Sequence, residues 1–168
     1  ITHAMLRWMA PFMSFTAEEA WPVLAGAASR GSIFFETYAE LPTANEALLA
    51  KWARICEVRN VVNKEIETVR AAGQVGASLQ ANVRLSAPAD DHALLASLGD
   101  DLKFALIVSA VELVAGDALA VQVTPATAAK CERCWHYRDD VGSDAAHPTL
   151  CGRCTSNLFG AGEVRTVA

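Results

Sequence analysis

The 168-residue sequence lacks the motifs by which most enzymes are recognised. It contains no glycine-rich loop that would cradle a phosphate, no nucleophile elbow, and no serine, histidine and aspartate set that would justify a catalytic triad. No apolar run approaches the length of a membrane span, and the N-terminus has neither the basic start nor the cleavage site of a secretory signal. We therefore expect a non-catalytic chain with no membrane partner.

The sequence also has fewer basic than acidic side chains, 14 against 19. The formal net charge is −5, which argues against a free-standing, nonspecific nucleic-acid binder. The charge is unevenly distributed, however: residues 51–70 carry five basic and three acidic side chains, and residues 130–168 carry five of each. A polyanion would therefore meet these two stretches rather than the rest of the chain.

Cysteine is scarce, but four of the five cysteines form two Cys-x-x-Cys pairs, Cys131 with Cys134 and Cys151 with Cys154, separated by sixteen residues. This spacing predicts a zinc site with four thiolate ligands, in which no position is left for a catalytic water. Iron, disulfides or redox dithiols are the alternatives, although so few cysteines suit a reducing compartment. The fifth, Cys56, lies in a helical pattern and is predicted to be a small buried hydrophobe.

The first half of the chain has the apolar periodicity of helices. We expect a helix end over residues 2–12, a short helix from Thr16 to about Leu24, a loop over residues 25–46, and a long helix from about Asn45 to Ala72. Thr16 and Glu19 have the spacing of a capping box. The apolar stripe of the long helix comprises Leu48, Trp52, Ile55, Val62, Ile66 and Val69, and Arg59 falls on this stripe.

From Ser78 the apolar period changes to two, which predicts a strand that ends at Pro88. A short helix from Asp90 to Leu98, capped by Asp90 or Asp91, should follow, and then a hairpin of strands over residues 104–114 and 119–123. The predicted fold class is α+β, in three parts. These are a mainly α-helical bundle over residues 1–76, a small α/β unit over residues 77–128 and a four-cysteine zinc module over residues 129–168.

Aromatic and basic side chains are interleaved around the cysteine pairs. Arginines at positions 133 and 153 could simply offset the net −2 charge of zinc with four thiolates. Alternatively, aromatic rings on a stiff turn offer faces for unstacked bases, and arginines offer phosphate contacts, which would suit single-stranded RNA. Arg59 could equally be a paired arginine between helices. His136, which like His147 flanks the cysteine pairs, could be a competing zinc ligand, a group beside the ligands or a surface residue. The candidate RNA-binding residues are Arg133, Trp135, His136, Tyr137, Arg138, Arg153, Arg59 and Lys64.

Three groups of motifs resemble one known family. The zinc-module motif Cys131-Glu-Arg-Cys-Trp-His-Tyr137, with Asp140-Val-Gly142 and Cys151-Gly-Arg-Cys154-x-x-Asn157, resembles the C-terminal zinc module of bacterial isoleucyl-tRNA synthetases. The segment from Met9 to Trp21 resembles the start of the anticodon-binding bundle in the isoleucyl, valyl and leucyl class I synthetases. The segments 58–67 and 75–81 resemble the long helix and turn of the same group.

The resemblance implies a piece cut from a longer cytoplasmic enzyme that joins isoleucine to tRNA(Ile) with ATP and Mg²⁺. The catalytic and editing domains would lie in the missing N-terminal part of that chain. The present chain would bind the anticodon region of the tRNA, hold one structural Zn²⁺ and be a monomer, with an apolar patch at residues 1–12 facing the missing domains. The alternative is a zinc-ribbon adaptor that binds another protein and has no RNA role.

Overall fold

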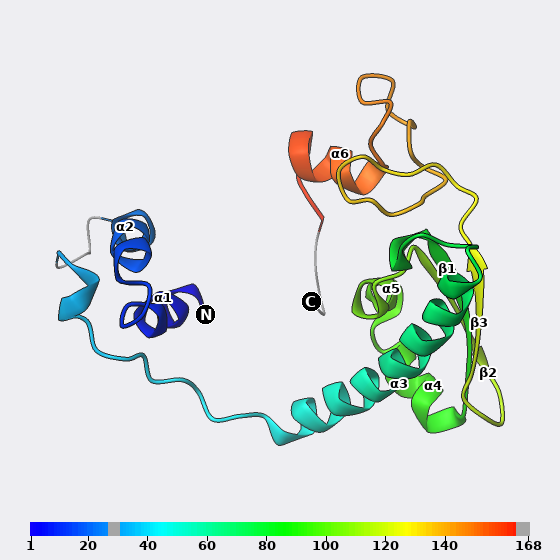
Figure 1. The fold of residues 1–168 in the computed structure, drawn as a ribbon, viewed down its shortest axis with the longest axis horizontal. Coiled ribbons are helices and arrows are strands. Elements are labelled where there is room, and N and C mark those ends of the chain that lie inside the picture. The colour runs from blue at the N-terminus through cyan, green and yellow to red at the C-terminus, as the bar shows by residue number, and fades with distance from the viewer. Residues whose placement is uncertain (27–30, 164–168) are drawn as a thin grey trace. The chain divides into compact units, whose positions relative to one another are not determined.

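The computed structural model describes residues 1–26 and 31–163, and the chain divides into two compact units, residues 1–45 and the part from Glu46 onward (Figure 1). The boundaries expected after residues 76 and 128 do not coincide with this division, because the long helix shares its buried face with the sheet. Part of the expected 25–46 loop and the last five residues of the expected zinc module lie outside the described residues. No helix in the described ranges combines the length and apolarity needed to cross a membrane.

The described residues of the first unit form two helices and one short turn of helix. They are α1 (Thr2–Met9), α2 (Ser14–Ala25) and the 3-10 helix η2 (Ile33–Phe35). Its core is small: Leu6, Ala10, Ala17, Trp21 and Ile33 are buried together. Many other apolar side chains of this unit are exposed, as expected for residues 1–12, among them Met5, Trp8 and Phe12.

The capping box expected at the start of α2 is wrong. The helix begins two residues earlier than expected, at Ser14, and no side chain caps it. Ser14 Oγ instead donates a hydrogen bond to the carbonyl oxygen of Ala10 at 2.9 Å. The carboxylate of Glu18 accepts hydrogen bonds from Ser32 Oγ at 2.8 Å and from the Ile33 N–H at 2.9 Å. Glu18 of this helix therefore anchors the start of η2.

The long helix is confirmed. It is α3 (Glu46–Ala71), and its buried residues are Ile55, Val58, Val62 and Ile66. The expected stripe omitted Val58 and extended too far towards the N-terminus, where Leu48 is exposed. The expectation of a buried Cys56 is also wrong, because this residue points about 100° away from Ile55 around the helix and is exposed.

A three-stranded sheet packs against α3. The chain continues through η3 (Ser78–Gln80), β1 (Ala81–Ala87), α4 (Ala89–Ala96), η4 (Gly99–Asp101), α5 (Leu102–Leu106), β2 (Ala110–Ala115) and β3 (Ala120–Pro125). The strand order is β2-β1-β3, with β2 parallel and β3 antiparallel to the central β1. We call this part, from Glu46 to Pro125, the α/β body.

Three expectations for the α/β body need correction. Strands β2 and β3 are consecutive but do not pair as a hairpin, because β1 lies between them. The apolar run from Phe104 begins within a helix rather than a strand: Leu102 and Leu106, four residues apart, are both buried. The helix α4 has no side-chain cap, because it begins at Ala89 with Pro88 as its N-cap residue; Asp91 lies within the first turn and forms an ion pair with Arg54 of α3.

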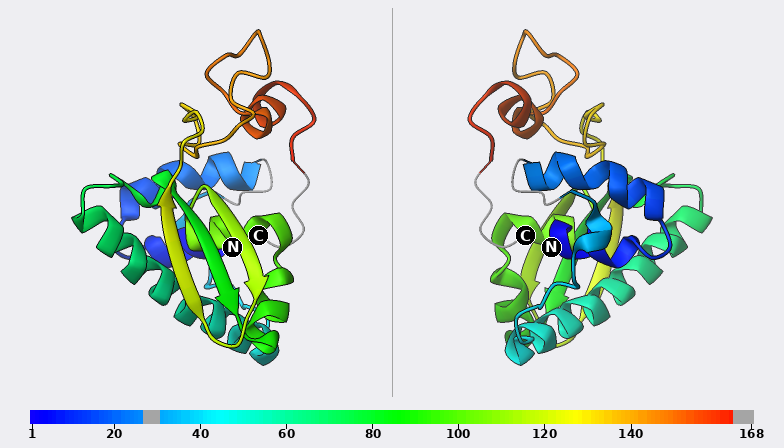
Figure 2. Two further views of the ribbon diagram at one scale, coloured as in Figure 1. Left: turned by 90° about the vertical axis from the view of Figure 1, so that its right-hand side faces the viewer. Right: turned by 90° about the vertical axis from the view of Figure 1, so that its left-hand side faces the viewer.

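The core of the body lies on one face of the sheet. Val83, Leu85 and Ala87 of β1 point into it and are buried, and Leu85 is opposite Leu113 on one neighbouring strand and Val121 on the other. Figure 1 shows α3, α4 and α5 on this face, and the left view of Figure 2 looks onto the opposite, open face of the sheet. The period-two pattern of the sequence predicts this division correctly.

Candidate metal centre

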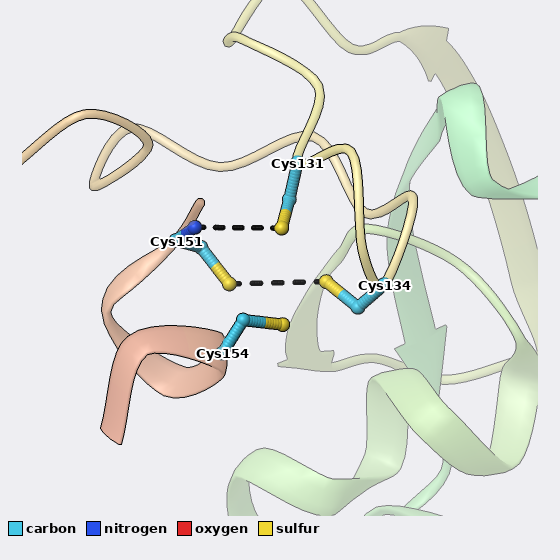
Figure 3. A group of neighbouring side chains, drawn as sticks. All are labelled: Cys131, Cys134, Cys151 and Cys154. Carbon is cyan, nitrogen blue, oxygen red and sulfur yellow. Dashed lines mark hydrogen bonds between the residues drawn. The ribbon is translucent and has the colours of Figure 1, made fainter. Parts of the chain in front are cut away.

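The four paired cysteines converge on one point (Figure 3). Their sulfur atoms all lie within 4.8 Å of one another, and the Sγ atoms of Cys134 and Cys151 are 3.8 Å apart. Zinc at its usual distance of about 2.3 Å from each thiolate would place tetrahedral sulfurs about 3.8 Å apart. The donor set therefore fits one zinc ion held by Cys131, Cys134, Cys151 and Cys154, with every coordination place filled by protein.

Two different local structures present these thiols. The first pair lies on a tight turn, in which the Trp135 N–H donates to the Cys131 carbonyl oxygen at 2.9 Å. The second pair opens the last helix, α6 (Gly152–Phe159): Cys151 is its N-cap residue and Cys154 lies in its first turn. We call these two structures the first and second knuckle.

The loop between the knuckles is closed by Gly142. Its N–H donates to the Leu150 carbonyl oxygen at 3.0 Å. Its φ of 79° is a conformation that side chains disfavour, and a Cβ would lie only 2.9 Å from the Pro148 carbonyl oxygen. Only glycine fits this turn, which explains its place in the Asp140-Val-Gly142 motif.

The thiols do not ionise equally without a metal. Burial alone would raise the pKa of Cys131, but nearby backbone N–H groups outweigh burial and lower it to about 6. Burial raises the pKa of Cys134 to about 12 and also raises the pKa of Cys151. A bound zinc ion would hold all four groups as thiolates, since only the thiolate is a ligand.

The geometry does not favour the redox and disulfide alternatives. All five cysteines are free thiols. A redox cysteine needs a low pKa together with solvent access. Cys131 has the lowered pKa but is fully buried, whereas Cys134 is partly exposed but has a raised pKa. These two properties are therefore not combined in either residue of the first knuckle.

The arginines near the thiols differ in their partners. Arg133 is exposed, and its Nη1 donates to Cys154 Sγ at 3.6 Å. Arg138 pairs with Asp140 through two contacts of 2.8 and 3.1 Å, and Arg153 pairs with Glu163 through two contacts of 2.5 and 2.9 Å. The hydrogen bonds that these two arginines donate to the carboxylates raise the pKa of both guanidinium groups. Arg133 is thus the most available of the three.

Trp135 directly follows the first knuckle and is 60% exposed. Its φ of 65° lies in the left-handed region, which is uncommon for a large side chain. Its indole N–H donates to the Glu132 carbonyl oxygen at 3.1 Å, and the Lys130 ammonium lies 5.1 Å from the ring centroid. The ring is therefore held in a fixed orientation while most of its surface faces solvent.

The other two aromatic candidates are less accessible. His136 is half-buried; its Nδ1 lies 3.2 Å from the Cys134 carbonyl oxygen, and its Nε2 is buried without a hydrogen-bond partner among the described residues. Burial lowers the pKa of this imidazole, and the charges of nearby arginine and lysine side chains add to the effect. Tyr137 is also half-buried, and its N–H donates to Ser109 Oγ at 2.7 Å.

The two candidates outside the zinc module lie on α3. Lys64 is exposed. Arg59 is half-buried, and its Nε is buried without a hydrogen-bond partner among the described residues. The knuckles thus bring together six of the eight candidate residues, and the long helix carries the other two.

Sequence reasoning missed three residues around the knuckles. Lys130 lies over the Trp135 ring, Ser109 receives the Tyr137 N–H, and Phe104 packs against the zinc module. Only Ser109 had a recognisable signal, as a single polar residue in an apolar stretch of sequence. It is the one buried polar residue in the described part of the chain.

Comparison with known proteins agrees with this architecture. A family described as a zinc finger found in FPG and IleRS matches residues 129–157, which contain all four cysteines. A second family, described as the anticodon-binding domain of tRNA ligase, matches residues 1–85, just over half of the chain. The chain belongs to the anticodon-binding domain family of tRNA ligases.

Individual relatives narrow the comparison within this family. The chain is 57% identical to an isoleucine–tRNA ligase of Ralstonia pickettii and 56% identical to one of Bordetella petrii, in both cases over 100% of this chain. It is 54% identical to the isoleucine–tRNA ligase of Thiobacillus denitrificans over 98% of this chain. The matches cover only 18–19% of the lengths of these relatives. The chain is therefore similar, over 98–100% of its own length, to the anticodon-binding and zinc-finger region of isoleucine–tRNA ligases.

Proposed function

We propose that this chain is the tRNA-binding part of an isoleucine–tRNA ligase and that it binds the anticodon region of tRNA(Ile). The observation that carries the proposal is the match of the anticodon-binding family to residues 1–85, together with similarity to isoleucine–tRNA ligases over the whole chain. The complete protein would join isoleucine to the tRNA with ATP and Mg²⁺ in the cytoplasm. That chemistry would belong to its catalytic domain, since the present sequence has no motif for it.

Within the zinc module, we assign the RNA contacts mainly to the first knuckle. Trp135 would stack on an unpaired base, and Arg133 would contact a phosphate close by. Tyr137 would line the same surface. Support comes from exposure and pairing: Trp135 and Arg133 are exposed, whereas Arg138 and Arg153 are held by carboxylates. The two paired arginines and His136 would support the knuckles.

The zinc ion would supply rigidity rather than chemistry in this role. Holding both knuckles together fixes the backbone that presents the indole ring, and this lowers the entropy cost of ordering the ring on binding. Lys64 of α3 would add a second, electrostatic contact on the α/β body, and Arg59 is a further candidate on the same helix. We propose that the chain acts as a monomer.

The direct test is binding of the chain to tRNA(Ile) and to a tRNA of another specificity, at low and moderate salt. Trp135→Ala should weaken binding to tRNA(Ile) roughly tenfold or more, because stacking of a base on an aromatic ring is worth about 1–3 kcal/mol. Phe159→Ala is the matched control, since Phe159 is an aromatic residue of the same module with similar exposure, 61% against 60%. A zinc chelator should abolish the preference for tRNA(Ile).

Two results would contradict the proposal. Equal binding to both tRNAs that weakens steeply with salt would mean that the chain binds RNA by electrostatic attraction only. Discrimination between tRNAs would then belong to other parts of the ligase. No binding by a folded, zinc-loaded chain would favour the adaptor role, in which the zinc module binds another protein.

A further inference from the structure

The zinc module contacts the α/β body around one aromatic ring. The guanidinium carbon of Arg153 lies 4.6 Å from the centroid of the Phe104 ring, and the His136 ring meets the same ring edge-on at 5.3 Å. Phe104 belongs to α5 of the body, whereas His136 follows the first knuckle and Arg153 lies within the second. The second knuckle and the segment directly after the first knuckle therefore each contribute one side chain to the same ring.

A carboxylate fixes the position of Arg153 over the Phe104 ring. Glu163 grips the guanidinium of Arg153 through two contacts of 2.5 and 2.9 Å, which fixes the position of this group over the ring. The Glu163 N–H in turn donates to the Asn157 side chain at 2.8 Å, so the carboxylate is itself anchored to α6. The Arg153 side chain is only 19% exposed, and a shielded cation over an aromatic ring is more strongly attracted than an exposed one.

A second contact lies beside the first. Ser109, between α5 and β2, accepts the Tyr137 N–H at 2.7 Å and donates to the Leu79 carbonyl oxygen. Ser109 is 5% exposed, so this hydrogen bond is protected from water. The knuckles thus meet the body at Phe104 and at Ser109, and two separate contacts restrict rotation as well as translation.

We propose that Phe104 is a positioning residue that fixes the orientation of the zinc module, and with it the Trp135 surface, relative to the α/β body. Because the two knuckles reach the ring from separate stretches of chain, both contacts form only while the four cysteines are held together. The proposal rests on the proposed function in one respect: the fixed orientation matters for RNA because contacts on α3 and on the first knuckle would engage the same molecule at once.

The orientation can be measured without RNA. Cys56 of α3 is exposed and offers a natural site for a spin label on the body, and Ala145→Cys adds an exposed site in the loop between the knuckles. Electron–electron distance measurements on the zinc-loaded 168-residue chain should give a narrow distribution. Phe104→Leu keeps an apolar side chain but removes the ring, and should broaden the distribution. Phe104→Tyr keeps the ring and should restore the narrow one.

Three further measurements make the result specific. Zinc content and the absorption spectrum of the cobalt-substituted protein should be unchanged in all Phe104 variants, because no ligand is altered. Glu163→Gln, which leaves the core of the body untouched, should also broaden the distribution by loosening Arg153. Phe159→Leu makes the same exchange at a residue that stacks on His147, and should change nothing. An unchanged distribution in both Phe104→Leu and Glu163→Gln would overturn the proposal.

Binding to tRNA(Ile) tests whether the orientation set by Phe104 matters for RNA binding. Phe104→Leu should lower the affinity about threefold to tenfold, the range expected for losing a cation–π contact that preorganises the surface. The salt dependence should stay the same, because no phosphate contact is removed. Wild-type affinity in a variant with a broadened distribution would overturn the positioning role. Absence of binding by the wild-type chain would instead refute the proposed function, while the distance measurement still decides whether Phe104 sets the orientation.

Discussion

Arg54 of α3 and Asp91 of α4 form a two-pronged ion pair, in which Nε donates to Oδ1 at 2.8 Å and Nη2 donates to Oδ2 at 2.6 Å. The Asp91 side chain is 14% exposed, whereas Arg54 is 41% exposed and also reaches Glu57 on its own helix at 2.5 Å. The pair joins the first turn of α4 to the N-terminal half of α3. An acidic residue in the first turn of a helix is also favoured by the helix dipole.

This pair predicts a pH-dependent contribution to stability. The hydrogen bonds from Arg54 lower the pKa of Asp91 in the folded chain below its usual value. The stabilisation is therefore complete above the unfolded pKa of about 3.9 and is lost as the pH falls through the lower, folded value. Asp91→Asn should lower the free energy of unfolding by about 0.5–1 kcal/mol near neutral pH. Urea unfolding at several pH values should show the difference vanishing in acid.

Asp90→Asn is the matched control for this experiment. Asp90 lies in the same first turn of α4, but its side chain is exposed. The exchange removes the same charge near the helix dipole without breaking the pair with Arg54. Equal destabilisation by the two substitutions would mean that the dipole, and not the ion pair, accounts for the effect of Asp91.

The metal centre and the long helix could be predicted because each follows from short-range rules. Two Cys-x-x-Cys pairs at this separation are typical of a four-thiolate zinc site, and in the structure all four sulfurs lie within 4.8 Å of one another. In the long helix, residues such as Ile55, Val62 and Ile66 repeat at the helical period over many turns, so the buried face is defined several times over. An error at one end, as at Leu48, does not alter the assignment.

The sheet order and the partners of the arginines could not be predicted, because both depend on long-range contacts. Sequence adjacency and the Gly116-Asp117 turn favour a hairpin of β2 and β3, but nothing local shows that β1 lies between them. The apolar run after Leu102 fits a strand or a buried helix equally well. The pairing of Arg153 with Glu163, ten residues away, depends on where α6 ends and the chain turns back.

Thiol accessibility gives a test of the zinc site that needs no RNA. In the zinc-loaded chain, an alkylating reagent should modify Cys56 rapidly and leave the other four cysteines unmodified, because Cys56 is exposed and the knuckle thiols would be metal ligands. Adding a chelator should expose the remaining four, as counted by mass spectrometry. If the knuckle thiols react as quickly as Cys56 while zinc is present, the prediction of a four-thiolate zinc site is wrong and the redox alternative is favoured.

Arg133 and Arg138 should differ in what their loss affects. Arg133→Gln should weaken RNA binding and reduce the slope of log affinity against log salt by about 0.7, the value for one phosphate contact on a single strand. Arg138→Gln should mainly lower thermal stability, because Arg138 is held by Asp140, whose pKa it lowers. Salt titrations and melting curves of both variants check this. An unchanged slope together with weaker zinc binding in Arg133→Gln would mean that this arginine only offsets the thiolate charge.

Trp135→Gly separates a functional from a structural role for the exposed indole ring. Glycine adopts a φ of 65° without strain, whereas a non-glycine residue there costs on the order of 1 kcal/mol. If the ring serves RNA binding, the substitution should leave zinc content and melting temperature unchanged or slightly improved, and should abolish most of the affinity for tRNA(Ile). A marked loss of stability would show that the ring, through its hydrogen bond to Glu132 and its contact with Lys130, instead holds the first knuckle together. Backbone strain at an exposed aromatic residue is expected where binding depends on the position of the ring. The Trp135→Gly variant measures both the stability that the strain costs and the RNA affinity that the ring provides.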